Sequence, residues 1–279
     1  MTAIGPIRTL LMPAPLDRRL PEPNSLRRAS DAAKAAVAVA VDALAGSAVT
    51  EETGLYVGQQ QVPLEYCQQF IDTSYRNGPR FASPMLFSES VANNAATHLS
   101  LTLGFRGALQ TFIGSRTAGI GALLAAAEDV RAGTVESGLV VVLSFASPLT
   151  VQAYEAVYRS KAGFPLQNGA AAFRVRREAF EGSRELARAG LRCRGRTPAE
   201  QRRALKDLDA PPGAKAASVF WLAREESLAA LREAMGEILP RRPEGESFAL
   251  DPFLALSEGG PRTVVTLGEE GTAGLVALA

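Results

Sequence analysis

Residues that can act as a nucleophile or a base are scarce in this chain. Its 279 residues include one histidine, His98, and two cysteines, Cys67 and Cys193. A mechanism that needs two histidines on this chain is therefore excluded, and the two cysteines lack the spacing of a metal site. Cys67 lies in Glu65-Tyr66-Cys67-Gln68 with no small-residue turn after it, which predicts a buried structural cysteine. We expect neither a bound metal nor a cofactor.

A turn of small residues is the best place for nucleophilic chemistry. It begins at Gly114-Ser115-Arg116 and leads into Gly119-Ile120-Gly121. Ser115 needs a base beside it, and a Ser115–His98 pair is one alternative; a packing or surface role for His98 is the other, which we favour. The glycine pattern is too short for a phosphate loop and lacks its lysine. It indicates instead a helix that packs closely on a sheet.

Composition and charge restrict the class of protein. Hydrophobic residues make up 47% of the chain, enough for a sizeable core, and the formal net charge is +1. Such a balance indicates neither nucleic acid nor a membrane surface as a partner. The sequence has no evident signal peptide and no apolar run of roughly 18 residues, so we expect a cytoplasmic protein with reduced cysteines.

Short apolar segments alternate with stretches of helical character. Ser30 and Asp31 are candidate N-caps for an Ala-rich helix that runs to Leu44. Charged residues dominate from Arg176 to Lys215, where little strand character is present. The alternation predicts an α/β layered fold with helices packed on a sheet. The expected strands span residues 4–12, 54–59, 109–114, 139–144, 170–175, 263–267 and 274–279, and the expected helices residues 31–44, 63–75, 88–103, 119–131 and 222–239.

Four segments, in this order, resemble the N-terminal half of a β-ketoacyl synthase. A closing segment, Glu270 to Val276, is weakly similar to the hairpin that ends these enzymes. The resemblance implies a thiolase-like fold with a single domain over 1–279, a synthase-like part over 1–178 and a reduced C-terminal part over 179–279. The four segments are Pro84 to Asn94, similar to P-x-x-F-x-x-S-x-x-N; Leu103 to Gly107, similar to L-G-x-R-G; the strand and helix from Thr111 to Leu123; and Gly163 to Val175, similar to G-F-x-x-G-E-G-A-A.

The resemblance places Arg116 where an active synthase has its cysteine nucleophile. An arginine cannot form an acyl thioester, and the two histidines with which the family assists decarboxylation are missing. Among relatives of the synthases, the chain length factors lack this cysteine and pair with an active synthase. The resemblance therefore implies a non-catalytic subunit of this type, in a heterodimer of bacterial polyketide or fatty-acid-like biosynthesis.

The resemblance also implies where the partner binds. In thiolase-type folds the strand before the nucleophile turn pairs with its counterpart across the dimer axis. Arg116 belongs to this interface if it pairs with an anionic group of the partner's substrate arm; the alternative is a solvated or structurally paired arginine. The other interface residues implied are Leu109, Gln110, Thr111, Phe112, Ile113 and Gly114.

Other interpretations stay open on the sequence. The basic run from Arg184 to Arg203 could dock an acidic acyl carrier protein, although we favour a solvated helix and loop. The chain could be an enzyme of altered chemistry that uses Ser115 or a carboxylate such as Glu89 or Glu128. It could also be a structural homodimer or scaffold. A neighbouring gene for a full-length synthase would favour the heterodimer over both.

Overall fold

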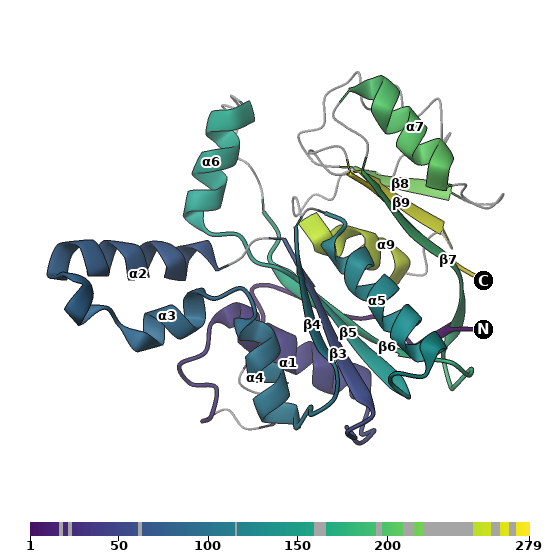
Figure 1. Ribbon diagram of the computed structural model, residues 1–279, viewed down its shortest axis with the longest axis horizontal. Coiled ribbons are helices and arrows are strands. Elements are labelled where there is room, and N and C mark those ends of the chain that lie inside the picture. Colours follow the sequence, from purple (N-terminus) through teal and green to yellow (C-terminus); the bar gives the residue numbers. More distant parts are fainter. Residues whose placement is uncertain are drawn as a thin grey trace.

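The structure is layered, with helices and strands alternating along the chain (Figure 1). This computed structural model describes residues 1–16, 19–21, 24–60, 63–114, 116–158, 166–193, 197–208, 215–219, 248–257, 263–267 and 272–279. The elements of the first part are β1 (Ala3–Ile4), β2 (Arg8–Leu11), α1 (Asp31–Leu44), β3 (Thr53–Gln59), α2 (Leu64–Asn77), η2 (Pro79–Phe81), α3 (Pro84–Ser90), α4 (Asn94–Leu103), β4 (Leu109–Ile113) and α5 (Ala118–Ala132). Those of the second part are β5 (Ser137–Ser144), α6 (Pro148–Tyr158), β6 (Gly169–Arg176), β7 (Arg184–Cys193), α7 (Pro198–Leu208), β8 (Lys215–Val219), η3 (Phe248–Leu250), α9 (Asp251–Ser257), β9 (Thr263–Leu267) and β10 (Thr272–Leu278).

The strands form two sheets with helices between and outside them. The first has the order β4-β3-β5-β6, with β2 also paired to β6, and the second has the order β7-β10-β9-β8. The short strand β1 pairs with both β6 and β7 and so joins the two sheets. Helices α5 and α9 contact strands of both sheets and lie between them. Helices α1 and α4 cover the outer face of the first sheet, and α7 covers the second.

Two strands of the first sheet are buried along their whole length. β3 pairs in parallel with β4 on one side and with β5 on the other, and β5 pairs antiparallel with β6. All residues of β3 and β5 are buried, as expected for apolar strands that are covered on both faces. β4 is the end strand of this sheet and is largely exposed.

Glycines let α5 approach the first sheet closely. A Cβ added to Gly58 of β3 would lie 2.6 Å from the Cα of Gly119, and a Cβ on Gly119 would lie 2.6 Å from the Phe253 ring. Neither position can therefore carry a larger side chain without a shift of backbone or core. The expectation that the small residues of this turn serve close helix packing is confirmed.

Most of the elements expected from the sequence are present. Helix α1 starts after Ser30, whose hydroxyl accepts a hydrogen bond from the Ala33 N–H, so Ser30 is the N-cap. The expected helix over 88–103 is wrong, because α3 ends at Ser90 and α4 begins at Asn94. The expectation of little strand character after Arg176 is also wrong, since β7 spans ten residues and pairs with β10. The expected helix over 222–239 lies outside the described residues.

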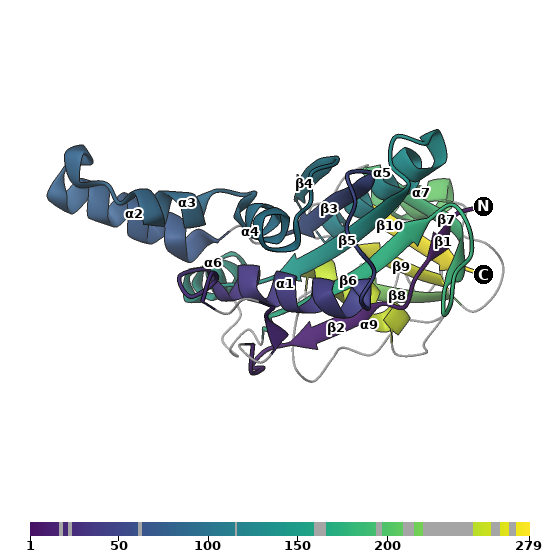
Figure 2. The same ribbon diagram turned by 90° about the horizontal axis from the view of Figure 1, so that it is seen from below.

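Residues 64–90 form an arm that projects from the body. Helix α2, η2 and α3 make up this arm, which extends to the left in Figures 1 and 2. A helix over residues 63–75 was expected here, and α2 is that helix, but it contains no buried residue. No helix in the described part of the chain is long and apolar enough to cross a membrane.

Candidate functional site

The N-terminal turn of α5 carries a fully buried arginine. Arg116 has a relative exposure of 0% although it is two residues from the start of the helix. Ile113 and Gly114, three and two residues before it, are exposed, and the helix after it lies between the two sheets. The chain therefore turns inward at Arg116 and places a guanidinium in the core.

The buried guanidinium is paired with a carboxylate of α9. The Nη2 atom of Arg116 lies 2.8 Å from Oδ2 of Asp251, the first residue of α9, and its Nε lies 3.4 Å from the hydroxyl of Thr266 on β9. Asp251 is 14% exposed at its side chain, so most of this ion pair is removed from water. Of the two interpretations of Arg116, the structure supports the structurally paired arginine. The side chain points into its own chain, and its place in a partner interface stays a prediction.

This turn offers no thiol or imidazole among the described residues. Ser115 lies outside them, so the proposed Ser115–His98 pair is untested. Arg116 is a permanent cation and can act neither as a nucleophile nor as a base at neutral pH. The arrangement links the start of α5 to α9 by an ion pair and to β9 by a hydrogen bond.

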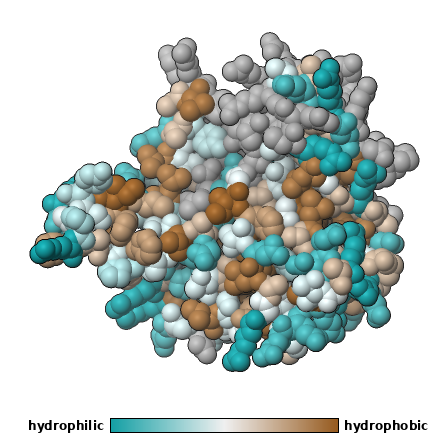
Figure 3. Space-filling view, viewed as in Figure 1, coloured by the Kyte–Doolittle hydropathy of each residue, from teal (hydrophilic) through white to brown (hydrophobic). Residues whose placement is uncertain are grey.

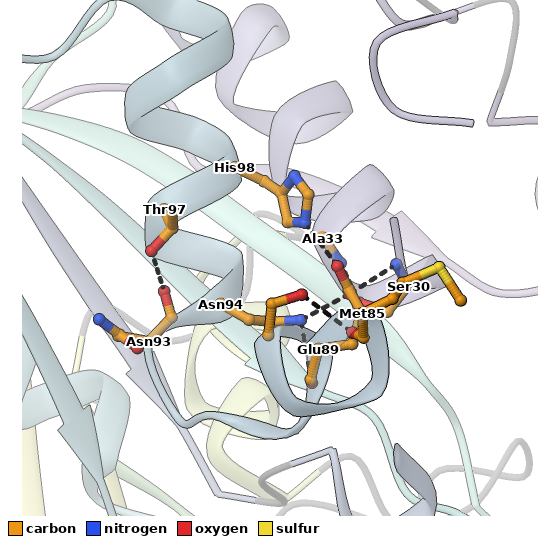
Figure 4. A network of polar contacts seen from close by, with 9 residues as sticks. Ser30, Ala33, Met85, Glu89, Asn93, Asn94, Thr97 and His98 are labelled. Atoms are coloured by element: carbon orange, nitrogen blue, oxygen red, sulfur yellow. Dashed lines mark hydrogen bonds and ion pairs between the residues drawn. The ribbon is translucent and has the colours of Figure 1, made fainter. Parts of the chain in front are cut away.

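A second polar cluster joins the arm to the body, and Glu89 is its centre (Figure 4). Nε2 of His98 lies 2.9 Å from Oε1 of Glu89. Oε2 of Glu89 accepts hydrogen bonds from the Asn94 side-chain amide at 2.8 Å and from the Ser30 backbone N–H at 3.1 Å. Glu89 is on α3, Asn94 and His98 are on α4, and Ser30 precedes α1, so one buried carboxylate ties three elements together.

The cluster explains why α3 and α4 are separate helices. Ser30 uses its N–H for Glu89 and its hydroxyl to cap α1, so the carboxylate must reach under the start of α1. Val91 adopts an extended conformation, and the Gln59 amide donates a hydrogen bond to the Ala92 carbonyl. These contacts stabilise a non-helical conformation of the chain between the two helices. His98 therefore has a packing role, as favoured from the sequence.

The end strand β4 presents a free backbone edge. Its side chains at Leu109 and Ile113 are exposed, while Phe112 faces α5 at Gly121. β3 covers one edge, and the other edge of β4 meets no other strand of the described chain. An exposed strand edge is a template for pairing with another chain. Whether Leu109 to Gly114 do so stays a prediction.

Comparison with solved structures finds this fold among ketosynthases. The ishigamide ketosynthase/chain length factor has a TM-score of 0.77 at 19% identity, over 96% of this chain and 85% of that one. The AntDE ketosynthase, in complex with its type II polyketide synthase acyl-carrier protein AntF, has a TM-score of 0.77 at 16% identity, over 100% and 98%. A β-ketoacyl synthase from Burkholderia phymatum STM815 has a TM-score of 0.72 at 15% identity, over 92% and 84%. The chain has the thiolase-like fold of the β-ketoacyl synthases. No protein-family model and no curated protein matches its sequence.

Within this thiolase-like chain, the carboxylates considered as catalytic groups have different surroundings. Both oxygens of Glu89 accept hydrogen bonds inside the protein, and the residue is 5% exposed. Glu128 is exposed on the outer side of α5. A buried carboxylate that is fully engaged by donors stabilises the fold, and an exposed one lacks the enclosed site that acid–base catalysis uses. A catalytic role for either carboxylate stays a prediction.

Glu89→Gln is expected to destabilise the thiolase-like fold. The new amide NH₂ would face one of the donors that now bind the carboxylate, which leaves a buried group without an acceptor. We expect a loss of about 1–3 kcal/mol in the free energy of unfolding, and therefore a lower Tm. Chemical denaturation and circular dichroism measure both. Glu128→Gln is the control, with a change within about 0.5 kcal/mol. Equal stability of the two variants would contradict the anchoring role of Glu89.

Two other groups singled out in the sequence are placed differently from expectation. Cys67 is half-buried on α2, not buried, and its thiol donates to the Ser90 carbonyl at 3.2 Å. The basic run is not a helix and loop at its start, because Arg184 and Arg192 lie on β7. Arg184 donates to the Leu256 carbonyl, and Arg192 is exposed. Arg194 and Arg196 lie outside the described residues.

A cavity of about 350 Å³ lies at the carboxyl ends of β3 and β5. Gln59, Asn94 and Asn168 supply amides to its wall, and Leu143 and Phe145 supply apolar surface. The Asn168 side chain is held by the backbone of Ala146 through two hydrogen bonds. The cavity is on the side of the first sheet that faces α1, so the sheet separates it from α5.

Proposed function

We propose that this chain is a non-catalytic, chain-length-factor-like subunit that pairs with an active β-ketoacyl synthase in bacterial polyketide biosynthesis. The proposal places the complex in the cytoplasm, with an acyl carrier protein delivering the substrates to the synthase. The chain itself would stabilise the synthase and help to shape the far end of its acyl tunnel. Fatty-acid-like biosynthesis is the broader alternative for the pathway.

One observation carries the proposal. The turn at the start of α5, where the resemblance puts the nucleophile of a synthase, holds a buried arginine in an ion pair with Asp251. The same turn in an active synthase must offer a thiolate, which a helix N-terminus stabilises. The fold likeness to the ishigamide ketosynthase/chain length factor supports the assignment to the chain-length-factor type. The free edge of β4 supports the need for a partner.

We expect the isolated chain to have no condensing activity toward acyl and malonyl thioesters. It offers no cysteine at the turn and has one histidine, which is engaged with Glu89. The measurement is thioester consumption and carbon dioxide release, with an active synthase as positive control. Arg116→Cys is expected to stay inactive as well, because the two histidines are still missing. Turnover by a partner-free sample of either protein would contradict the proposal.

Co-expression tests the pairing directly. The chain is expected to form a 1:1 complex with an active β-ketoacyl synthase, and mass photometry measures the stoichiometry. The complex should release products of a defined chain length, while the synthase without this chain should be insoluble or yield a different length distribution. A stable monomer that binds no synthase would refute the function.

A further inference from the structure

The cavity at the carboxyl ends of β3 and β5 is enclosed by segments that are far apart in the sequence. The start of α1, the root of α2 and the residues that lead into α6 all contribute to its wall. Helices α2 and α6 contact each other beside it, and hydrophobic residues gather on both in Figure 3. Its volume of about 350 Å³ is that of a small-molecule site.

Two buried amides in the wall are each held in one orientation. Gln59 and Asn94 are both 4% exposed. The Gln59 Nε2 donates to the Ala92 carbonyl, and the Asn94 Nδ2 donates to the backbone carbonyl of Glu89 at 3.2 Å and to its Oε2 at 2.8 Å (Figure 4). Rotating either amide by half a turn would set its oxygen against another oxygen. The protein therefore uses the nitrogen side of both amides.

The oxygen side of both amides has no donor in the described part of the chain. Oε1 of Gln59 and Oδ1 of Asn94 accept no hydrogen bond there, although both residues line the cavity. Buried acceptors are nearly always satisfied, so the contents of the cavity must supply donors. Water can do this, but it does not cover the apolar surface of Leu143 and Phe145 in the same wall. A ligand with both a donor and an apolar part satisfies the whole wall.

The charges around the cavity disfavour a charged ligand of either sign. The carboxylates of Asp31 and Glu65 belong to the wall and repel an anion. Burial raises the pKa of Tyr66, and the negative charges of Glu89, Asp31 and Glu65 raise it further. A cation is opposed by Lys34, which pairs with Asp31 at 3.9 Å, and by the N-terminal end of α1 with its partial positive charge. A neutral group that both donates and accepts suits these surroundings.

We propose that this cavity binds a small neutral ligand with a carboxamide group and an apolar tail. The N–H groups of the carboxamide supply the donors that Gln59 and Asn94 need, and its carbonyl faces the first turn of α1. The tail contacts Leu143 and Phe145. The first sheet separates this site from α5 and Arg116, so the inference goes beyond the proposed function and does not depend on it.

The wall contains its own spectroscopic reporter. The chain has four methionines, and Met12 lines the cavity while Met1 and Met85 are exposed. The experiment titrates the full chain, labelled with ¹³C at the methionine methyl groups, with hexanamide, hexanoate and hexylamine. Loss of a signal in Met12→Leu assigns the reporter. We expect hexanamide to shift the Met12 signal with a Kd at least about tenfold lower than those of the two charged probes, because each would bury a charge.

Two variants test the residues that hold the ligand. Gln59→Met removes the free oxygen at similar side-chain length, and we expect it to weaken hexanamide binding at least about tenfold. Gln68→Met makes the same change on the exposed side of α2 and should stay within about twofold. Ala32→Leu narrows the cavity without removing either amide and should abolish the shift of the Met12 signal. The Tm of each variant shows whether it is folded.

Three results would overturn the inference. The first is a Met12 signal that hexanamide does not move at any concentration up to its solubility. The second is binding of hexanoate or hexylamine as tight as that of hexanamide. The third is unchanged hexanamide binding in folded Gln59→Met or in folded Ala32→Leu. If Gln59→Met does not fold, Ala32→Leu and the comparison of the three probes still decide the question.

Discussion

Arg116→Ala is expected to lower the free energy of unfolding by about 3–5 kcal/mol, because it leaves the Asp251 carboxylate in the core without its cation. The total stability of a domain is about 5–15 kcal/mol, so this is a large share of it. The truncation also leaves a cavity between α5, α9 and β9, which adds to the loss. Urea denaturation of the purified chain measures the change, and an insoluble variant would agree with it.

Replacing both charged residues by apolar ones separates the effect of the ion pair on stability from the effect of the volume that its side chains fill. Arg116→Met combined with Asp251→Leu removes both charges and restores apolar volume. Such replacements of buried ion pairs are often neutral or stabilising, so we expect the double variant to be clearly more stable than either single variant. If Arg116→Ala unfolds at the wild-type denaturant concentration, or if the double variant is no more stable than the single variants, the ion pair does not stabilise the fold.

The buried pair also shows what local sequence can and cannot predict. The apolar runs of β3 and β5 and the small residues of α5 predicted their elements within two residues, because burial on both faces leaves a continuous pattern. Nothing near Arg116 indicates Asp251, which follows it by 135 positions. A tertiary ion pair has no local sequence signal, so the sequence left open whether Arg116 is solvated or paired.

Two misassigned elements have similar causes. The break at Val91 depends on Gln59 and Ser30, which are far away in sequence, while residues 88–103 alone have helical character. β7 was missed because its three arginines outweighed the apolar residues that face the sheet's interior, of which Leu186 is buried. β strands of this kind are defined by their neighbours more than by composition. The exposure of the arm could not be read from the helical spacing of its apolar residues, because the same spacing fits a buried helix.

The pairing of β4 predicts a selective effect of proline along this strand. The Gly114 N–H donates to the Gln59 carbonyl, and the Ala108 carbonyl accepts from the Leu55 N–H. In a parallel pair every second residue bonds to a given neighbour, so the N–H of Phe112 points to β3 and that of Ile113 points to the free edge. Phe112→Pro would therefore damage the chain's own sheet, and Ile113→Pro is the variant that removes a donor from the proposed intermolecular pairing.

Ile113→Pro and Ile113→Asp are expected to leave the free chain folded and to abolish the 1:1 complex with the synthase. The side chain is 51% exposed in the free chain, so the aspartate costs little there, but in the centre of an interface it becomes a buried charge without a partner. A cost of about 3 kcal/mol would weaken the complex about a hundredfold. Size-exclusion chromatography and mass photometry on co-expressed pairs measure this, with Arg192→Glu on exposed β7 as the charge control. An intact complex with both Ile113 variants, or a complex broken by Arg192→Glu alone, would place the partner elsewhere and remove the main support for a chain-length-factor-like subunit.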